Sequence, residues 1–144
     1  VSDLVEELAA MAIASEVVLI SEVRVQQQLN VVGDSDQLYR LVSNLIVNAI
    51  QYTPAGGKVT VILDRTDDRT AEIEVQDTGI GIAAADIGRI FDRFYRVNSD
   101  RSRHTGGSGL GLAIAHTIAR AHRGSLSARS ELGGGSTFLL RLPL

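Results

Sequence analysis

One amphipathic segment in the middle of the chain constrains the fold more than any other feature. Between residues 36 and 52, apolar side chains recur at helical spacing, namely Leu38, Leu41, Val42, Leu45, Ile46 and Ala49. A helix with such a stripe must bury it against a second layer of structure. Capping residues at 33–36 and the Thr-Pro-Ala-Gly-Gly segment at 53–57 bound it, so we expect a helix over about 36–52.

The flanking segments predict what that helix packs against. Helical patterns occur at 3–14, about 84–92 and about 108–122, and strand patterns at 17–23, 29–32, 58–65, 70–76, 125–130 and 136–142. Residues 94–107 have little periodicity and predict a mobile loop. This order predicts an α/β two-layer sandwich, in which one mixed sheet carries helices on a single face, within one domain spanning residues 1–144.

Composition excludes several classes of function. The 144 residues carry a net charge of -3, which gives no basic field to hold nucleic acid and no reason to expect direct membrane contact. The chain has no cysteine, which excludes disulfides, thiol catalysis and cysteine zinc sites and fits a reducing compartment. Lys58 is the only lysine, so any bound phosphate must be neutralised mostly by arginine.

Three polar motifs are candidates for chemistry, and the first is a pair of asparagines. Asn44 and Asn48 are four residues apart and therefore share one face of the long helix. An amide oxygen suits Mg²⁺, and an amide nitrogen can donate to a phosphate. Helix-surface amides are common, however, so the pair alone is better explained as solvated side chains than as a ligand site.

The second motif is the loop from Asp77 to Ile82, which follows a strand. A carboxylate at a strand end can accept a hydrogen bond from an exocyclic amine such as that of adenine. Gly79 and Gly81 let the backbone approach a flat ligand, and Ile82 can supply an apolar wall. A simple turn between strand and helix is the alternative for this motif alone.

The third motif is the glycine-rich run from Gly106 to Gly111, which enters a helix. Free N–H groups and the helix dipole favour an anion there, so a phosphate cradle is one interpretation. No Gly-Lys-Ser/Thr follows, and Leu112 replaces the third glycine of a dinucleotide fingerprint. A flexible loop ending in a helix cap is the other interpretation.

Five motifs in order resemble those of one protein family. They are Asn44 to Ile50, Asp77 to Ile82, Phe91 to Arg96, Gly107 to Leu112 and Gly133 to Phe138. In this combination the chain resembles the catalytic, ATP-binding domain of a sensor histidine kinase. The resemblance implies a Bergerat fold, with a mixed, mostly antiparallel sheet and a mobile ATP lid at about 94–110.

The resemblance also implies roles for individual residues at the phosphate end of the ligand. Asn48 is expected to ligate Mg²⁺, with Asn44 near the phosphates and Arg96 and Arg101 reaching the terminal phosphates. The residues expected to form the lid hinge and contact the nucleotide there are Gly107, Ser108, Gly109, Leu110, Gly111 and Leu112.

At the adenine end, the resemblance implies that Asp77 recognises the adenine amine and that Gly79 and Gly81 shape the pocket. Tyr52 is expected beside the nucleotide, and Thr137 on the far side of the adenine pocket. Phe91 and Phe94 match an aromatic pair that packs the lid or meets partner helices, although simple core packing is an equal alternative.

Three positions depart from the family pattern. Gln51 stands where relatives often carry a basic residue, which moves phosphate neutralisation to Arg96, Arg101 or Arg103. His116 is expected on the surface. Arg123 stands where many relatives have glycine, and His122 is expected to be structural, near a helix end that tolerates its charge.

The resemblance implies a phosphoryl transfer whose acceptor is elsewhere. None of His104, His116 and His122 has a phosphoacceptor context, so we expect the isolated chain to bind Mg-ATP without making phosphohistidine. The acceptor would be a histidine on the protein's own dimerisation domain, and a response regulator would collect the phosphoryl group. We expect a monomeric domain of a homodimeric parent, cytoplasmic, with the parent free or anchored to the inner membrane.

Two alternative functions stay open at this point. An anti-sigma-factor-type serine kinase belongs to the same superfamily, and a degenerate domain could bind ATP and a partner without catalysis. ATP-hydrolysing relatives place a glutamate one turn before the metal-binding asparagine, where this chain has Asn44. An amide cannot act as the base, so rapid hydrolysis is disfavoured.

Overall fold

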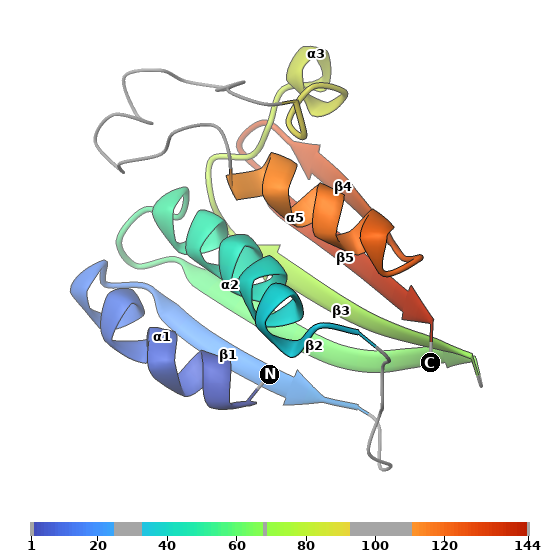
Figure 1. Ribbon diagram of the computed structural model, residues 1–144. Coiled ribbons are helices and arrows are strands. Elements are labelled where there is room, and N and C mark those ends of the chain that lie inside the picture. The colour runs from blue at the N-terminus through green and yellow to red at the C-terminus, as the bar shows by residue number, and fades with distance from the viewer. Residues whose placement is uncertain (1, 25–32, 68, 93–110, 144) are drawn as a thin grey trace.

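The computed structural model describes residues 2–24, 33–67, 69–92 and 111–143 (Figure 1). Its elements in chain order are α1 (Ser2–Ala14), β1 (Val18–Val23), α2 (Ser35–Gln51), β2 (Lys58–Asp67), β3 (Thr70–Asp77), α3 (Ala84–Ile87), α5 (Gly111–Ala121), β4 (Ser125–Glu131) and β5 (Gly135–Pro143). The expected strand at 29–32 and loop at 94–107 lie outside the described residues.

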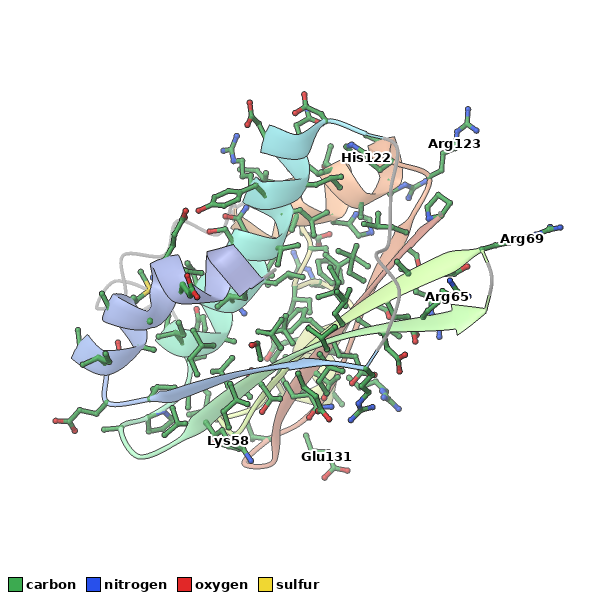
Figure 2. All side chains as sticks on the ribbon, turned by 90° about the horizontal axis from the view of Figure 1, so that it is seen from below. Lys58, Arg65, Arg69, His122, Arg123 and Glu131 are labelled. Carbon is green, nitrogen blue, oxygen red and sulfur yellow. The ribbon has the colours of Figure 1, made fainter. Side chains whose placement is uncertain are left out.

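The strands form one five-stranded sheet in the order β1-β2-β3-β5-β4. Strand β1 runs parallel to β2, and all other neighbours are antiparallel. Helices α1, α2 and α5 lie side by side on one face of this sheet (Figure 1), and the side-chain view shows the same layer above the strands (Figure 2). The predicted two-layer α/β sandwich is therefore confirmed.

The apolar stripe of α2 forms the centre of the core. Leu41, Leu45, Ile46 and Ala49 are fully buried, and the strand residues that face them across the layer are equally buried, namely Val59, Val61, Val75, Phe138 and Leu140. Asp34 caps α2, since its Oδ1 accepts the N–H groups of Asp36 at 2.9 Å and Gln37 at 3.2 Å. The sequence predicted both the stripe and the position of the cap.

The helix expected at 84–92 is shorter than predicted. Helix α3 ends at Ile87, has no side-chain cap and buries none of its residues. Ile90 is buried instead, from a turn beyond the helix. An isolated helix this short gains little from its own hydrogen bonds, so the burial of Ile90 decides the local backbone.

Candidate functional site

The asparagine pair lies on the half-buried flank of α2. The Asn44 Nδ2 atom donates a hydrogen bond to the carbonyl oxygen of Gly111, 3.1 Å away, at the start of α5. Asn48 is half-buried one turn further along, and its side chain makes no hydrogen bond to any other described residue. The Asn48 amide is therefore available to a ligand, whereas that of Asn44 is already partly engaged.

Asp77 ends strand β3 with its side chain on the helix-bearing face. Alternate residues of this strand are buried, and Asp77 is the last of them at 9% exposed. Its Oδ1 accepts the N–H of Gly79 at 2.8 Å. Burial raises the pKa of the Asp77 carboxyl, and the backbone N–H groups of Gly79 and Ser136 partly oppose that rise. A carboxylate has roughly four acceptor sites, so it keeps capacity for a ligand amine.

The loop after Asp77 packs against the C-terminal end of α2. Ile80 donates its N–H to the carbonyl oxygen of Tyr52 at 3.3 Å, and Tyr52 follows the last residue of α2. A Cβ atom on Gly79 would overlap that same carbonyl oxygen. The aspartate loop and the asparagine helix are thus in direct contact, as the sequence motifs required.

The hairpin between β4 and β5 holds the aspartate loop from the other side. Gly133 donates its N–H to the carbonyl oxygen of Ile80 at 2.7 Å, and Ile82 donates its N–H to Ser130 Oγ, also at 2.7 Å. Gly81 has a φ of +74°, and a Cβ there would overlap the Glu131 carbonyl oxygen. Glycine is therefore required at Gly81 both by its backbone angle and by the close approach of the hairpin.

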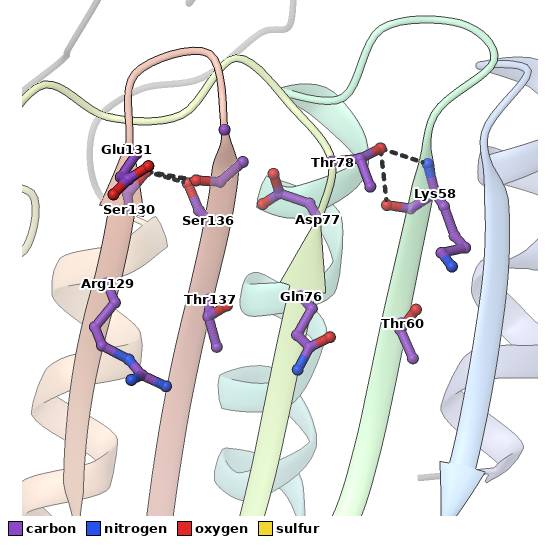
Figure 3. Close-up of a pocket in the computed structure, with 12 residues that line it drawn as sticks. Lys58, Thr60, Gln76, Asp77, Thr78, Arg129, Ser130, Glu131, Ser136 and Thr137 are labelled. Atoms are coloured by element: carbon purple, nitrogen blue, oxygen red, sulfur yellow. Dashed lines mark hydrogen bonds between the residues drawn. The ribbon is translucent and has the colours of Figure 1, made fainter.

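Two serines at the site were not predicted. The hydroxyls of Ser130 and Ser136 lie 2.8 Å apart, and Ser136 pairs with Asp77 across the β3–β5 ladder (Figure 3). Ser136 is 8% exposed and its backbone N–H approaches the Asp77 carboxylate. Its alternation with Phe138, Leu140 and Leu142 along the strand is the sequence signal that would have found it.

Thr137, expected to line the adenine pocket, directly follows Ser136 in strand β5. It pairs with Gln76 and Arg129 on the face of the sheet opposite the helices. Together with Thr60, Asp77 and Ser136, they line a polar hollow of about 610 Å³, seen in Figure 3 with the helices behind the strands. Successive strand residues point to opposite faces, so Ser136 shares the buried face with Asp77, whereas Thr137 lines the hollow from the other face.

Comparison with known proteins identifies the family. Residues 33–144 match the family described as histidine kinase-, DNA gyrase B- and HSP90-like ATPases. The chain belongs to this family. The sensor histidine kinase RppB of Synechocystis is 56% identical over the whole chain, which spans 31% of that relative's length.

Solved structures agree with this assignment. The mycobacterial sensor histidine kinase MprB superposes with a TM-score of 0.83 at 31% identity, covering 99% of this chain and 94% of that one. Full-length ShkA, solved in complex with AMPPNP, has a TM-score of 0.84 at 28% identity, covering 99% of this chain and 28% of that one. This chain is therefore a catalytic, ATP-binding domain of the sensor histidine kinase type.

Several expected site residues of this histidine kinase domain fall outside the described residues. They are Arg96, Arg101, Gly107, Ser108, Gly109 and Leu110, together with Phe94 and Arg103. Of the others, Tyr52 is half-buried after α2, Ile82 and Leu112 pack partly against the core, and Gly111 begins α5. No helix in the described part of the chain is long and apolar enough to cross a bilayer.

Phe91 and His116 pack against each other in this kinase domain. The Phe91 ring stacks on His116 with centroids 5.0 Å apart and meets Phe138 edge-on at 6.3 Å. His116, expected on the surface, is instead half-buried because Phe91 covers its ring. Core packing therefore accounts for Phe91.

His122 is structural, as expected. Its Nδ1 lies 2.9 Å from the carbonyl oxygen of Ile118, and its Nε2 accepts the N–H of Asp34 at 3.1 Å. A carbonyl oxygen can only accept, so Nδ1 carries the hydrogen and the ring is the neutral tautomer. These two hydrogen bonds, to the end of α5 and to the cap of α2, explain this histidine.

Arg123 adopts a backbone conformation that favours glycine, with a φ of +61°. We expect Arg123→Gly to raise the free energy of unfolding by about 1 kcal/mol. A non-glycine residue in the left-handed conformation costs roughly 1–2 kcal/mol, which the substitution removes. Glycine also makes the unfolded chain more flexible, and this offsets part of the gain. Urea unfolding measures the difference. Arg123→Ala keeps the strained angle and is the control. An equal gain of stability in both variants would mean that loss of the arginine side chain, and not relief of backbone strain, causes the effect.

Proposed function

We propose that this domain binds Mg-ATP and donates the γ-phosphoryl group to a histidine on a separate dimerisation domain. The observation that supports it best is the buried Asp77 carboxylate, set in a loop that touches the end of the asparagine helix. An anion is buried at such a position at a cost in stability, and a ligand donor offsets that cost. The AMPPNP bound by ShkA supports a nucleotide of this type.

The adenine end of the nucleotide would lie against the aspartate loop. Asp77 would accept the adenine amine, while Gly79 and Gly81 keep the backbone close to the ring. Tyr52 and Ile82 would provide the apolar surfaces on either side. Ser136, which lies beside Asp77, would line this end of the pocket together with Thr137.

The phosphate end would lie along α2 and the start of α5. Asn48 fits a magnesium ligand because its half-buried amide has no partner among the described residues. Mg²⁺ usually keeps several waters and takes one or two protein ligands plus phosphate oxygens, so a single amide suffices. When bound, the ion would neutralise charge on the phosphates, and Arg96, Arg101 and the residues from Gly107 to Leu112 would hold them.

Further features of the parent protein follow from this proposal. The acceptor histidine would lie on the parent's own dimerisation domain, and a response regulator would receive the phosphoryl group. Residues 1–144 would act as one catalytic domain, monomeric alone and paired within a homodimer. ATP is a cytoplasmic substrate, so this domain would work in the cytoplasm, whether the parent is free or anchored to the inner membrane.

A transfer assay separates this proposal from its alternatives. The domain is incubated with γ-labelled ATP, Mg²⁺ and the histidine-bearing helical hairpin of the parent's own dimerisation domain. Acid-labile phosphate on that hairpin is the expected result. Acid-stable phosphoserine on an added anti-anti-sigma-type substrate would favour the serine kinase, and nucleotide binding without any transfer would favour the interaction module.

Asn48→Ala is expected to remove most of the Mg²⁺ dependence of ATP binding. The variant loses the proposed protein ligand of the ion, so its ATP affinity in Mg²⁺ should fall about tenfold, towards that measured in EDTA. Calorimetric titration of ATP with and without Mg²⁺ measures this. Gln37→Ala, at the exposed start of the same helix, is the control. If Mg²⁺ raised the ATP affinity of Asn48→Ala as much as that of the wild type, Asn48 would not be a ligand of the ion.

A further inference from the structure

Two hydrogen bonds, here called ties, link helices α2 and α5 at points far apart along their length. Near the start of α5, Asn44 Nδ2 donates to the Gly111 carbonyl oxygen at 3.1 Å. Beyond its end, His122 Nε2 accepts the N–H of Asp34, the residue that caps α2. Between these ties, Ala115 and Ala119 are fully buried. Because two hydrogen bonds at separate points fix both the distance and the angle between the helices, α2 determines the orientation of α5.

The orientation of the Asn44 amide follows from its partner. A carbonyl oxygen can only accept, so the NH₂ end of the amide must face Gly111. The bond joins residues 67 positions apart, and Gly111 is both the last glycine of the glycine-rich run and the first residue of α5. The first turn of α5 carries N–H groups without helical partners, where a phosphate is favoured.

We propose that Asn44 is a positioning residue, which fixes the first turn of α5 relative to the helix that carries Asn48. Asn44 then influences the phosphates through Gly111 and α5. This step rests on the proposed function, because it assigns the phosphates to the start of α5. The placement of α5 by Asn44 does not depend on nucleotide and is testable without it.

Hydrogen exchange in the nucleotide-free domain tests the placement. Asn44→Ala should speed amide exchange in the first turns of α5, around Ala115, by about fivefold, the effect of one lost hydrogen bond of ordinary net strength. Amides near Ala119, held by the His122 tie, should be unchanged. Asn48→Ala is the matched control, since its amide has no partner in α5. Wild-type exchange rates throughout α5 in Asn44→Ala would overturn the inference.

Nucleotide affinity then tests the consequence. Asn44→Ala should weaken ATP binding about fivefold while leaving adenosine binding unchanged, and Asn44→Gln, which keeps an amide donor, should recover part of both effects. Weaker ATP binding with unchanged exchange would mean a direct phosphate contact and would overturn the inference, as would faster exchange with full ATP affinity. If the wild-type domain itself bound no ATP, the proposed function would fail while the exchange result still stood.

Discussion

Replacing Asp77 by alanine is expected to lower the affinity of the domain for ATP by about 10- to 100-fold, since a hydrogen bond to a charged group contributes roughly 1.5–3 kcal/mol. The variant also leaves the Gly79 N–H without the acceptor that shapes the loop. Calorimetric titration with ATP measures the loss. Asp77→Asn keeps an oxygen acceptor of the same shape and should lose less. Equal ATP affinity in wild type and Asp77→Ala would reject the assignment of Asp77 to adenine.

The same carboxylate should make the nucleotide-free domain less stable at neutral pH. Burial raises the pKa of Asp77 in the folded state. The contribution of the protonated Asp77 carboxyl to the free energy of unfolding is fully present below the ordinary carboxyl pKa. It is lost as the pH rises through the raised pKa of the folded state. Asp77→Asn has no such titration, so its advantage in urea unfolding should grow with pH across that window. An advantage that does not change with pH would contradict the raised pKa.

Replacing Gly135 by alanine is expected to destabilise the domain by about 3 kcal/mol, which combines left-handed strain of roughly 1–2 kcal/mol with an overpacking cost of similar size. Gly135 has a φ of +83°, and its Cβ would overlap the carbonyl oxygen of Asp77. The strand pairing beside Asp77 would have to open to admit the methyl group.

Gly133 provides a matched control for that substitution. Its φ is +80°, but a Cβ there meets nothing within 4 Å. Gly133→Ala therefore carries the backbone strain alone and should lose only about 1 kcal/mol in urea unfolding. Equal losses of unfolding free energy in the two variants would show that the close approach of Gly135 to Asp77 does not affect stability.

The parts of the fold that the sequence predicted are those governed by local periodicity. The stripe on α2, its Asp34 cap and the alternation of β3 each depend on neighbours within a few residues. The boundary of α3 was wrong because burial of Ile90, a tertiary effect, outweighed a weak helical pattern.

For the candidate site, the sequence indicates residues where a local motif marks chemistry, and it does not reveal contacts that depend on the folded geometry. Asp77 and its glycines were proposed because a carboxylate beside glycines is visible in one stretch of sequence. Ser136 was not predicted, although its alternation with Phe138 already places it on the core face. The tie between Asn44 and Gly111 joins residues 67 positions apart, which no local pattern reveals.

The central claim is that Asp77 and Asn48 contact opposite ends of one nucleotide, and magnetic resonance of the labelled domain tests it most directly. Adenosine alone should shift the amide signals of Gly79 and Gly81 and leave the Asn48 side-chain amide unchanged. Paramagnetic Mn²⁺-ATP should in addition broaden the Asn48 signal beyond detection. An Asn48 signal that stays sharp with bound Mn²⁺-ATP, or Gly79 and Gly81 signals that ignore adenosine, would contradict the account.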